Sequence, residues 1–393
     1  MATTAEQRRG YQGPAVLSYG FRPFFLAAAF WAALAMAIWL LMLSGRVSPP
    51  ITLAPVAWHA HELVFGYVPA VVAGFLLTAV PNWTGRLPVV GRPLLGLFLV
   101  WLAGRVAMLI SSWIGAPVAA LIDLAFLVVL ISVMAREIVA GGNWRNLKVL
   151  GGVGVLLAGN LLFHAEVISG GDAGRGLRMG IAGAVLLILL IGGRIIPSFT
   201  RNWLVRRAPG RLPRPFDSLD AVAIAASAVA LLLWVLWPEH EITAVAALLA
   251  GGLNAGRLAR WAGERTAAEP LVLILHVAYA FVPIGFVLVG FAGFYPQLLP
   301  ATGAVHGWTS GAIALMTLAV MTRASLGHTG QPLAAMLRIQ LIYLFALIAV
   351  LTRLLAAFAI GGEPMLLLSA VAWIGAFGGF CLVYAPLLLV RRA

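Results

Sequence analysis

Histidine and glutamate side chains occur together at several places in the sequence, and this combination can bind a metal or move protons. Six such residues fall in three short stretches: His59, His61, Glu62, His164, Glu166 and His306. Neutral imidazole suits haem iron, copper and zinc better than calcium or magnesium. The carboxylates can hold the second ring nitrogen of a histidine or relay protons. The residue types therefore predict a transition-metal site.

The spacing of these histidines limits which of them can share one metal. Successive residues of a regular helix turn by 100°, so His59 and His61 point about 200° apart and cannot both reach one ion. The sequence leaves open which of the two is a ligand. We expect a site near the outer ends of the helices that combines one of them with His164 and His306.

Two further histidines are predicted near the inner ends of the helices. His306 and His328 lie about 33 Å apart along a helix at 1.5 Å per residue, so they serve different sites. We expect a second, inner site at His276 and His328. A lone histidine in a membrane protein can also serve only packing and hydrogen bonding, and this alternative stays open for each of them.

Arginines form a second group of candidate binding residues. Arg22 lies within Gly-Phe-Arg-Pro-Phe-Phe, and Arg201 follows Pro-Ser-Phe-Thr. A guanidinium matches the oxygens of a carboxylate or phosphate, so both can clamp a haem propionate or an anionic substrate. The alternative is contact with anionic lipid headgroups. Arg105 and Asp123 are predicted at similar depth in neighbouring helices, where a lone charge is costly, and we expect a structural ion pair.

The elements that position these residues must be membrane helices. Apolar residues make up 62% of the 393 residues and charged residues 10%, and the mean hydropathy is +1.01. Soluble domains contain about 25% charged residues. The apolar runs lack the alternation of a membrane barrel, so the fold class is all-α, a polytopic protein with one transmembrane domain over residues 1–393. Twelve spans are predicted: 23–43, 58–80, 94–114, 117–139, 147–169, 176–196, 219–237, 242–261, 270–292, 303–323, 334–357 and 365–388.

Composition excludes other classes of protein. The single cysteine, Cys381, can form no internal disulfide and no four-cysteine cluster. The net charge of +13 does not indicate nucleic acid, because most basic residues lie in short loops on one side of the predicted spans. This distribution predicts that both termini are cytoplasmic. Residues 1–22 lack the short apolar core and cleavage site of a signal peptide, so the first apolar run is expected to stay in the membrane.

The second, sixth and tenth predicted helices end in related sequences. These are Pro81-Asn82-Trp83-Thr84, Pro197-Ser198-Phe199-Thr200 and Met321-Thr322-Arg323, with threonines about 120 residues apart. The interval indicates three pseudo-repeated four-helix units. The alternative is that inner helix ends share the same interfacial anchors.

Five blocks of the sequence resemble the NnrS family: GFRPFFL, WHAHELVFGY with GFLLTAVPNWTGR, NLLFHAE, GGRIIPSFTRNW and HGWTSGAIALMTLAVMTRASLGHTG. The resemblance extends from Gly20 to the last helix. It implies a bacterial inner-membrane protein that contains haem and copper and is linked to denitrification and nitric oxide stress. One or two b-type haems are then expected, and the ligands come from the histidines within or beside these blocks: His59, His61, His164, His276, His306 and His328.

The predicted architecture is also similar to that of haem–copper oxidases and nitric oxide reductases. The sequence departs from them because it has no adjacent His-His pair and no His-Pro-Glu-Val-Tyr block. A shared active site is therefore not supported.

We expect this membrane metalloprotein to bind nitric oxide at the outer site and to reduce it, assisted by a second metal or by Glu62 and Glu166. The electrons are expected to come from quinol or from another donor. The first alternative is a protein that binds nitric oxide or handles haem or metal without turnover. The second is a secondary transporter, which the clustered histidines fit less well.

Overall fold

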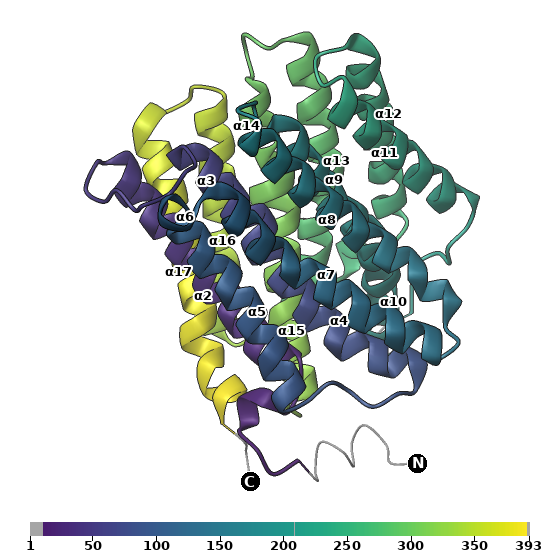
Figure 1. The fold of residues 1–393 in the computed structure, drawn as a ribbon. Coiled ribbons are helices and arrows are strands. Elements are labelled where there is room, and N and C mark those ends of the chain that lie inside the picture. The colour runs from purple at the N-terminus through teal and green to yellow at the C-terminus, as the bar shows by residue number, and fades with distance from the viewer. Residues whose placement is uncertain (1–10, 208, 391–393) are drawn as a thin grey trace. The chain divides into compact units, whose positions relative to one another are not determined.

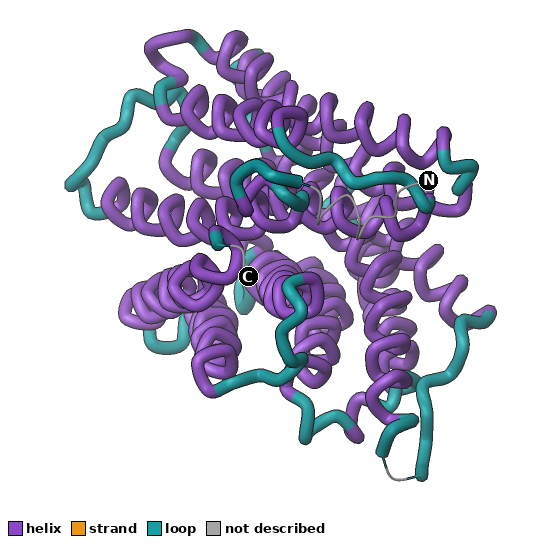
Figure 2. Tube along the Cα trace, turned by 90° about the horizontal axis from the view of Figure 1, so that it is seen from below, coloured by secondary structure: helices purple, strands orange, loops and turns teal. Residues whose placement is uncertain are grey.

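Helices are the only long regular elements in the described part of the chain. The computed structural model describes residues 11–207 and 209–390, and within these ranges it contains helices and connecting loops but no strand (Figure 2). The predicted all-α fold class is confirmed. The two chain ends, which the charge distribution places in the cytoplasm, lie outside the described residues.

Twelve helical stretches of the described residues are long and apolar enough to cross a membrane, as the sequence predicts. The chain is thus a multi-pass membrane protein. The stretches are Phe21–Leu43 (α2), Pro55–Thr84 (α3 to α4), Arg92–Leu109 (α5), Ala116–Ala140 (α7), Trp144–Ile168 (mainly α8), Gly174–Leu204 (α9 to α10), Ser218–Leu236 (α11), Glu241–Ala259 (α12), Pro270–Phe294 (α13), Ala301–His328 (α14 to α15), Leu337–Ala357 (α16) and Gly362–Leu389 (α17).

Two of these helices contain a proline near their inner end. The predicted apolar spans stop at residues 80 and 196, and the helices continue through Pro81 and Pro197, as the related end sequences predict, to Thr84 and Leu204. A proline removes one backbone hydrogen bond, and in a membrane bundle nearby hydroxyl groups and packing neighbours compensate. The hydroxyls of Thr84 and Thr200 add side-chain hydrogen bonds in the turns after the prolines, because each donates to the carbonyl four residues earlier, at 2.9 Å.

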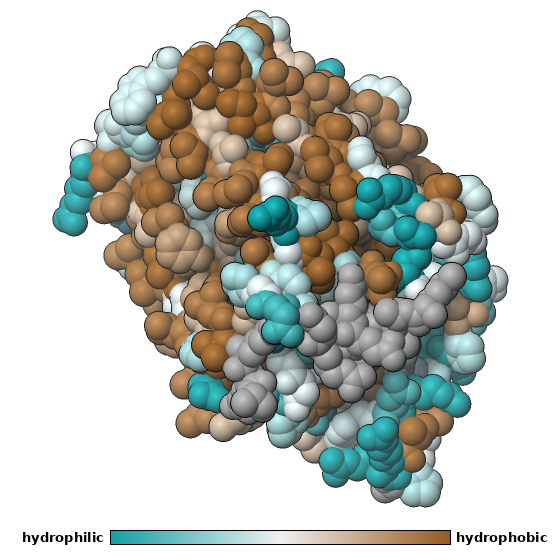
Figure 3. Space-filling model, turned by 60° about the horizontal axis from the view of Figure 1, so that its bottom comes forward, coloured by the Kyte–Doolittle hydropathy of each residue, from teal (hydrophilic) through white to brown (hydrophobic). Residues whose placement is uncertain are grey.

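Large apolar side chains cover much of the molecular surface. In Figure 3 hydrophobic residues dominate the face shown, and hydrophilic residues are confined to patches. Leu382 and Trp113 are 82% and 75% exposed, a degree of apolar exposure that a soluble protein avoids. Contact with lipid hydrocarbon accounts for this surface, and the backbone polar groups are satisfied within the helices.

The contacts of the chain divide it into two compact units. The first contains Met1–Gly183 together with Phe377–Ala393, and the second contains Ala184–Ala376. One domain over residues 1–393 stays a prediction.

In the first unit, α2, α4, α5, α7 and α8 pack against one another in pairs, and α5, α7 and α8 lie side by side (Figure 1). Two glycines of the second span make close approach possible. A Cβ atom at Gly74 would lie 2.6 Å from the ring of Phe25, and one at Gly66 would lie 2.2 Å from Nη1 of Arg105. Small residues therefore let α2 and the Arg105 guanidinium reach this helix.

Three spans contain a wide, π-helical segment, and they are the second, sixth and tenth, which share related sequences. The segments are η2 (Glu62–Tyr67), η4 (Ile188–Gly192) and η6 (Gly307–Ile313), followed by α4 (Val68–Thr84), α10 (Gly193–Leu204) and α15 (Ala314–His328). They are preceded by α3 (Pro55–His61), α9 (Gly174–Leu187) and α14 (Ala301–Ala304). Such segments are rare and often lie at functional sites. Their recurrence supports the proposed threefold repeat.

The second unit contains a buried ion pair that braces one of these segments. Arg257 is 1% exposed and donates from Nε to Asp220 at 2.8 Å. Its Nη1 donates to the Tyr279 hydroxyl at 2.9 Å and to the Leu189 carbonyl at 3.1 Å. Gly193 provides the space, because a Cβ there would overlap the guanidinium. The arginine thus supplies a donor to a carbonyl in η4.

An ion pair between two loops of the second unit is expected to make the stability of the Gly263–Arg265 turn depend on pH. Arg211 donates to both carboxylate oxygens of Glu264, at 2.6 and 3.2 Å, and this bonding lowers the pKa of Glu264. The stabilisation is present above the ordinary pKa of a glutamate and is lost as the pH falls through the lowered value. Hydrogen exchange of the Gly263–Arg265 amides, corrected for intrinsic rates, is expected to accelerate on acidification. Arg211→Gln should remove this pH dependence, and an unchanged profile in that variant would contradict the assignment.

Candidate metal centre

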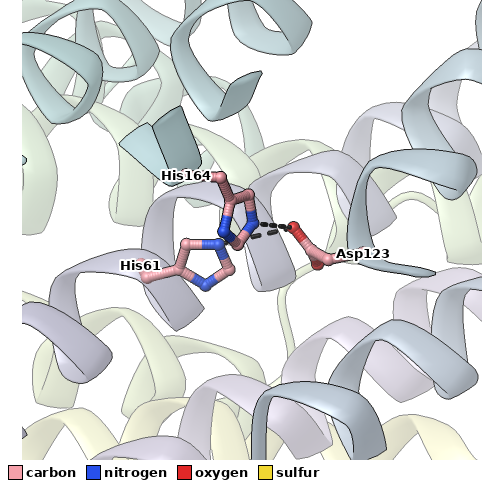
Figure 4. A group of neighbouring side chains, drawn as sticks. All are labelled: His61, Asp123 and His164. Atoms are coloured by element: carbon pink, nitrogen blue, oxygen red, sulfur yellow. Dashed lines mark hydrogen bonds and ion pairs between the residues drawn. The ribbon is translucent and has the colours of Figure 1, made fainter. Parts of the chain in front are cut away.

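Two histidines and one aspartate of the first unit meet in a fully enclosed cluster. His61 ends α3, Asp123 lies on α7, and His164 lies on α8 (Figure 4). The three residues are 0%, 2% and 5% exposed. Oδ2 of Asp123 lies 3.1 Å from Nε2 of His164 and 3.4 Å from Nε2 of His61. One ligand atom from each residue lies within 4.8 Å of the others, so the three can hold a metal ion together.

The helix positions explain why these side chains share one depth. His61 lies six residues after the start of α3, Asp123 seven after the start of α7, and His164 four before the end of α8. At 1.5 Å per residue each is roughly 6–10 Å from the same end of the bundle. Packing of α7 against α8 brings the last two together.

Both ring nitrogens of His61 face oxygen atoms. Nδ1 lies 2.9 Å from Oε1 of Glu62, and Nε2 lies 3.2 Å from Oδ1 of Asn160. The amide nitrogen of Asn160 donates to Oδ2 of Asp123 at 2.7 Å, which orients its oxygen toward His61. Because both oxygens accept, this arrangement suits a doubly protonated imidazolium, whose Nε2 proton a metal ion can replace.

Arg105 joins the two acidic residues of the cluster, and the predicted ion pair with Asp123 is confirmed. Nη2 of Arg105 contacts Oδ1 of Asp123. Nη1 of Arg105 lies 2.5 Å from Oε2 of Glu62. Trp31 donates from its indole N–H to the same glutamate oxygen at 2.9 Å. Two buried carboxylates and one guanidinium leave one excess negative charge, which a proton on His61 or a metal cation balances.

Aromatic rings pack against His61, which is buried with the rest of the cluster. Its imidazole centroid lies 4.9 Å from that of Phe163 and 5.4 Å from that of Phe65. In such surroundings charged groups interact strongly. Two imidazoles and one carboxylate in a buried site are a donor set for a first-row transition metal.

The structure separates the neighbouring candidates from this cluster. Of the two histidines between which the sequence cannot choose, His61 lies beside His164, whereas His59 stacks on Trp39 with ring centroids 4.2 Å apart. Glu166 accepts the backbone N–H of Gly176 at 2.9 Å, at the start of α9. Its part in catalysis stays a prediction.

The other candidate histidines belong to the second unit. Nδ1 of His306 donates to the Thr302 carbonyl at 2.8 Å. His276 is buried on α13, with Nε2 2.7 Å from the Thr200 hydroxyl, and His328 ends α15. Metal or haem ligation by any of the three stays a prediction.

The two candidate arginines differ in their surroundings. Arg22 is buried and donates from Nη1 to the carbonyls of Leu388 and Leu387, at 2.9 and 3.2 Å. It thereby stabilises the C-terminal end of α17, where carbonyls lack helical partners. Arg201 is exposed on α10. A propionate- or substrate-binding role for either arginine stays a prediction.

Asp123 of the cluster and its neighbour Asn160 are not among the sequence candidates for metal binding. Asp123 is expected only as the partner of Arg105, and Asn160 is not singled out. Depth offers a signal for Asp123, because it lies as far into its span as His61 lies into its own. Helical spacing offers one for Asn160, because it precedes His164 by four residues and shares its face.

Comparison with known proteins identifies the family. No curated protein matches the chain. The family model described as NnrS protein matches residues 15–392, which include every residue of the cluster. With nearly the whole length covered, the chain belongs to the NnrS family.

Proposed function

We propose that this NnrS-family protein binds nitric oxide at a metal centre formed by His61, Asp123 and His164, and reduces it, protecting the cell against nitrosative stress. The balanced reaction joins two NO molecules with two electrons and two protons to give nitrous oxide and water. The observation that supports it is the buried cluster of two imidazoles and a carboxylate, within ligand distance of one another. The resemblance supplies nitric oxide as the ligand, and bacterial inner membrane as the location.

The charges of the cluster suit the binding of electron-rich ligands. With a divalent ion and neutral histidines, Arg105 and the ion together exceed the charge of Glu62 and Asp123 by one. A fixed positive excess in a buried site stabilises negative charge that develops on a ligand during reduction. Arg105 is 2% exposed and contacts both carboxylates, so this charge cannot move away.

Glu62 is the residue best placed to handle a proton. Its Oε1 lies 2.9 Å from Nδ1 of His61, and its Oε2 is held by Arg105 and Trp31. One oxygen thus exchanges a proton with the imidazole while the other fixes the carboxylate in place. This geometry meets the distance requirement for acid–base catalysis.

Haem, which the resemblance also implies, fits His306 better than it fits the cluster. The bond from Nδ1 of His306 to the Thr302 carbonyl fixes the tautomer that metal-binding histidines commonly adopt, with Nε2 as the ligand atom. In the cluster, by contrast, oxygens lie within 3.4 Å of both nitrogens of His61, which suits a single ion and leaves no place for a porphyrin plane. Bound haem would supply iron for nitric oxide binding and electron transfer, and quinol is the electron donor that we expect.

The test compares nitric oxide consumption by the purified protein, supplied with a quinol, with consumption by His164→Ala and His306→Ala. Optical spectra before and after reduction, with and without nitric oxide, report on haem. We expect His164→Ala to abolish consumption and His306→Ala to remove a haem band. His240→Ala is the control, because His240 only caps α12 through the Ile242 N–H. Full turnover by His164→Ala would refute the proposal.

A second candidate is a protein that binds nitric oxide or handles metal without turnover. The burial of His61 and Glu62, both 0% exposed, favours it because neither side chain is open to solvent in this conformation. Binding without steady-state consumption in the same assay would support this candidate.

A further inference from the structure

We propose that the ion at the centre is non-haem ferrous iron, held by Nε2 of His61, Nε2 of His164 and Oδ2 of Asp123. This inference deepens the proposed function and rests on it only for the presence of a metal at this cluster.

Two of the three distances between donor atoms are close to the edge length of a coordination octahedron. In an octahedral site with bonds of about 2.1 Å, neighbouring donor atoms lie about 3.0 Å apart. Oδ2 of Asp123 lies 3.1 Å from Nε2 of His164 and 3.4 Å from Nε2 of His61. One ligand atom of each histidine lies within 4.8 Å of the other, so a single ion can contact all three residues from one side once the side chains close around it.

The donor types favour ferrous iron over copper(I). Two imidazoles and one carboxylate on a shared face are the set used for ferrous iron, with the remaining positions left for exogenous ligands. Copper(I) prefers thiolate and thioether sulfur. The cysteine of the described chain, Cys381, instead lies with its sulfur 3.8 Å from the Leu26 carbonyl.

Neighbouring residues orient each ligand atom for this role. Arg105 contacts Oδ1 of Asp123, so the carboxylate offers only Oδ2 and binds through one oxygen. Asn160 donates to that Oδ2 and fixes its direction. Glu62 accepts the Nδ1 proton of His61, which leaves Nε2 as the ligand atom. A carboxylate behind a metal-bound histidine is the usual arrangement at metal sites.

The experiment measures iron, copper and zinc in purified full-length protein, and haem iron separately by its pyridine adduct. Nitric oxide is then added anaerobically to the reduced protein for EPR. High-spin non-haem ferrous iron gives a quartet-state nitrosyl signal, which differs from the doublet signal of haem nitrosyl. We expect non-haem iron near one per chain and a quartet signal. His164→Ala should lose both, with iron affinity lowered at least about 100-fold.

His61→Ala provides a second ligand variant in case His164→Ala folds poorly, and His240→Ala is the matched control at a solvent-facing turn. Copper or zinc in place of iron, or a quartet signal that survives in both ligand variants, would overturn the inference. Iron with a quartet signal but no nitric oxide turnover would leave the inference standing and remove the proposed activity. Nitric oxide turnover by protein without non-haem iron would overturn the inference and leave the proposed activity standing.

Discussion

Replacing Arg105 by leucine is expected to lower the free energy of unfolding by roughly 3–5 kcal/mol, because it leaves buried carboxylates without their cation. Arg105 contacts both Glu62 and Asp123, which are 0% and 2% exposed, so no solvent can replace it. Unfolding of the detergent-solubilised protein by added sodium dodecyl sulfate, followed by circular dichroism, measures the loss.

Arg136→Leu is the matched control for this variant. Its side chain is 68% exposed and pairs with Glu137, and exposed pairs contribute at most about 1 kcal/mol. Adding Glu62→Gln to Arg105→Leu should recover part of the lost stability, because one unpaired charge is removed. Equal stability of the Arg105 and Arg136 variants would show that the buried pair does not matter for folding.

The second large effect is expected on metal affinity when the two carboxylates are neutralised one at a time. Asp123→Asn and Glu62→Gln remove the same charge from the same contact with Arg105, but only Asp123 is a proposed ligand. We expect Asp123→Asn to weaken metal binding more than about 100-fold. Glu62→Gln changes a residue that contacts His61 and is not a proposed ligand, so we expect it to weaken binding about 10–100-fold. Competition with a chelator of known affinity measures both.

This pair of variants separates ligation from electrostatics. If charge alone mattered, the two substitutions would weaken binding equally, and the proposed role of Asp123 would fail. If Glu62→Gln had the larger effect, Glu62 would be the ligand in its place.

Hydropathy predicts the fold because each span must bury its backbone hydrogen bonds and expose apolar side chains to lipid. The ends of the spans show the limit of that inference. A proline often ends or kinks a helix in a soluble protein, whereas α4 and α10 continue past Pro81 and Pro197 within the packed bundle. The charge count predicts an orientation of the termini, which stays a prediction.

The candidate site is predicted in part. Depth along each span brings His61 and His164 together, and charge cost pairs Arg105 with Asp123. The sequence cannot choose between His59 and His61, because helix rotation is set by packing. The choice depends on contacts such as the stacking of His59 on Trp39. The sequence also does not predict the histidine contacts of Asp123, because the expected ion pair gives this aspartate a single partner. In the structure Oδ1 contacts Arg105, and Oδ2 contacts both His61 and His164.

Because of the wide turn η2, assembly of the metal centre depends on the number of residues between α3 and α4. A π turn holds one residue more than an α turn, so deletion of one residue within Glu62–Tyr67 would let the segment rewind as α-helix. Everything before it would then rotate by about 100° relative to α4, which carries His61 away from Asp123. The shortened helix would still cross a bilayer. A one-residue gap at this place in a homologue therefore marks a chain that keeps the fold and has lost the means to assemble the centre.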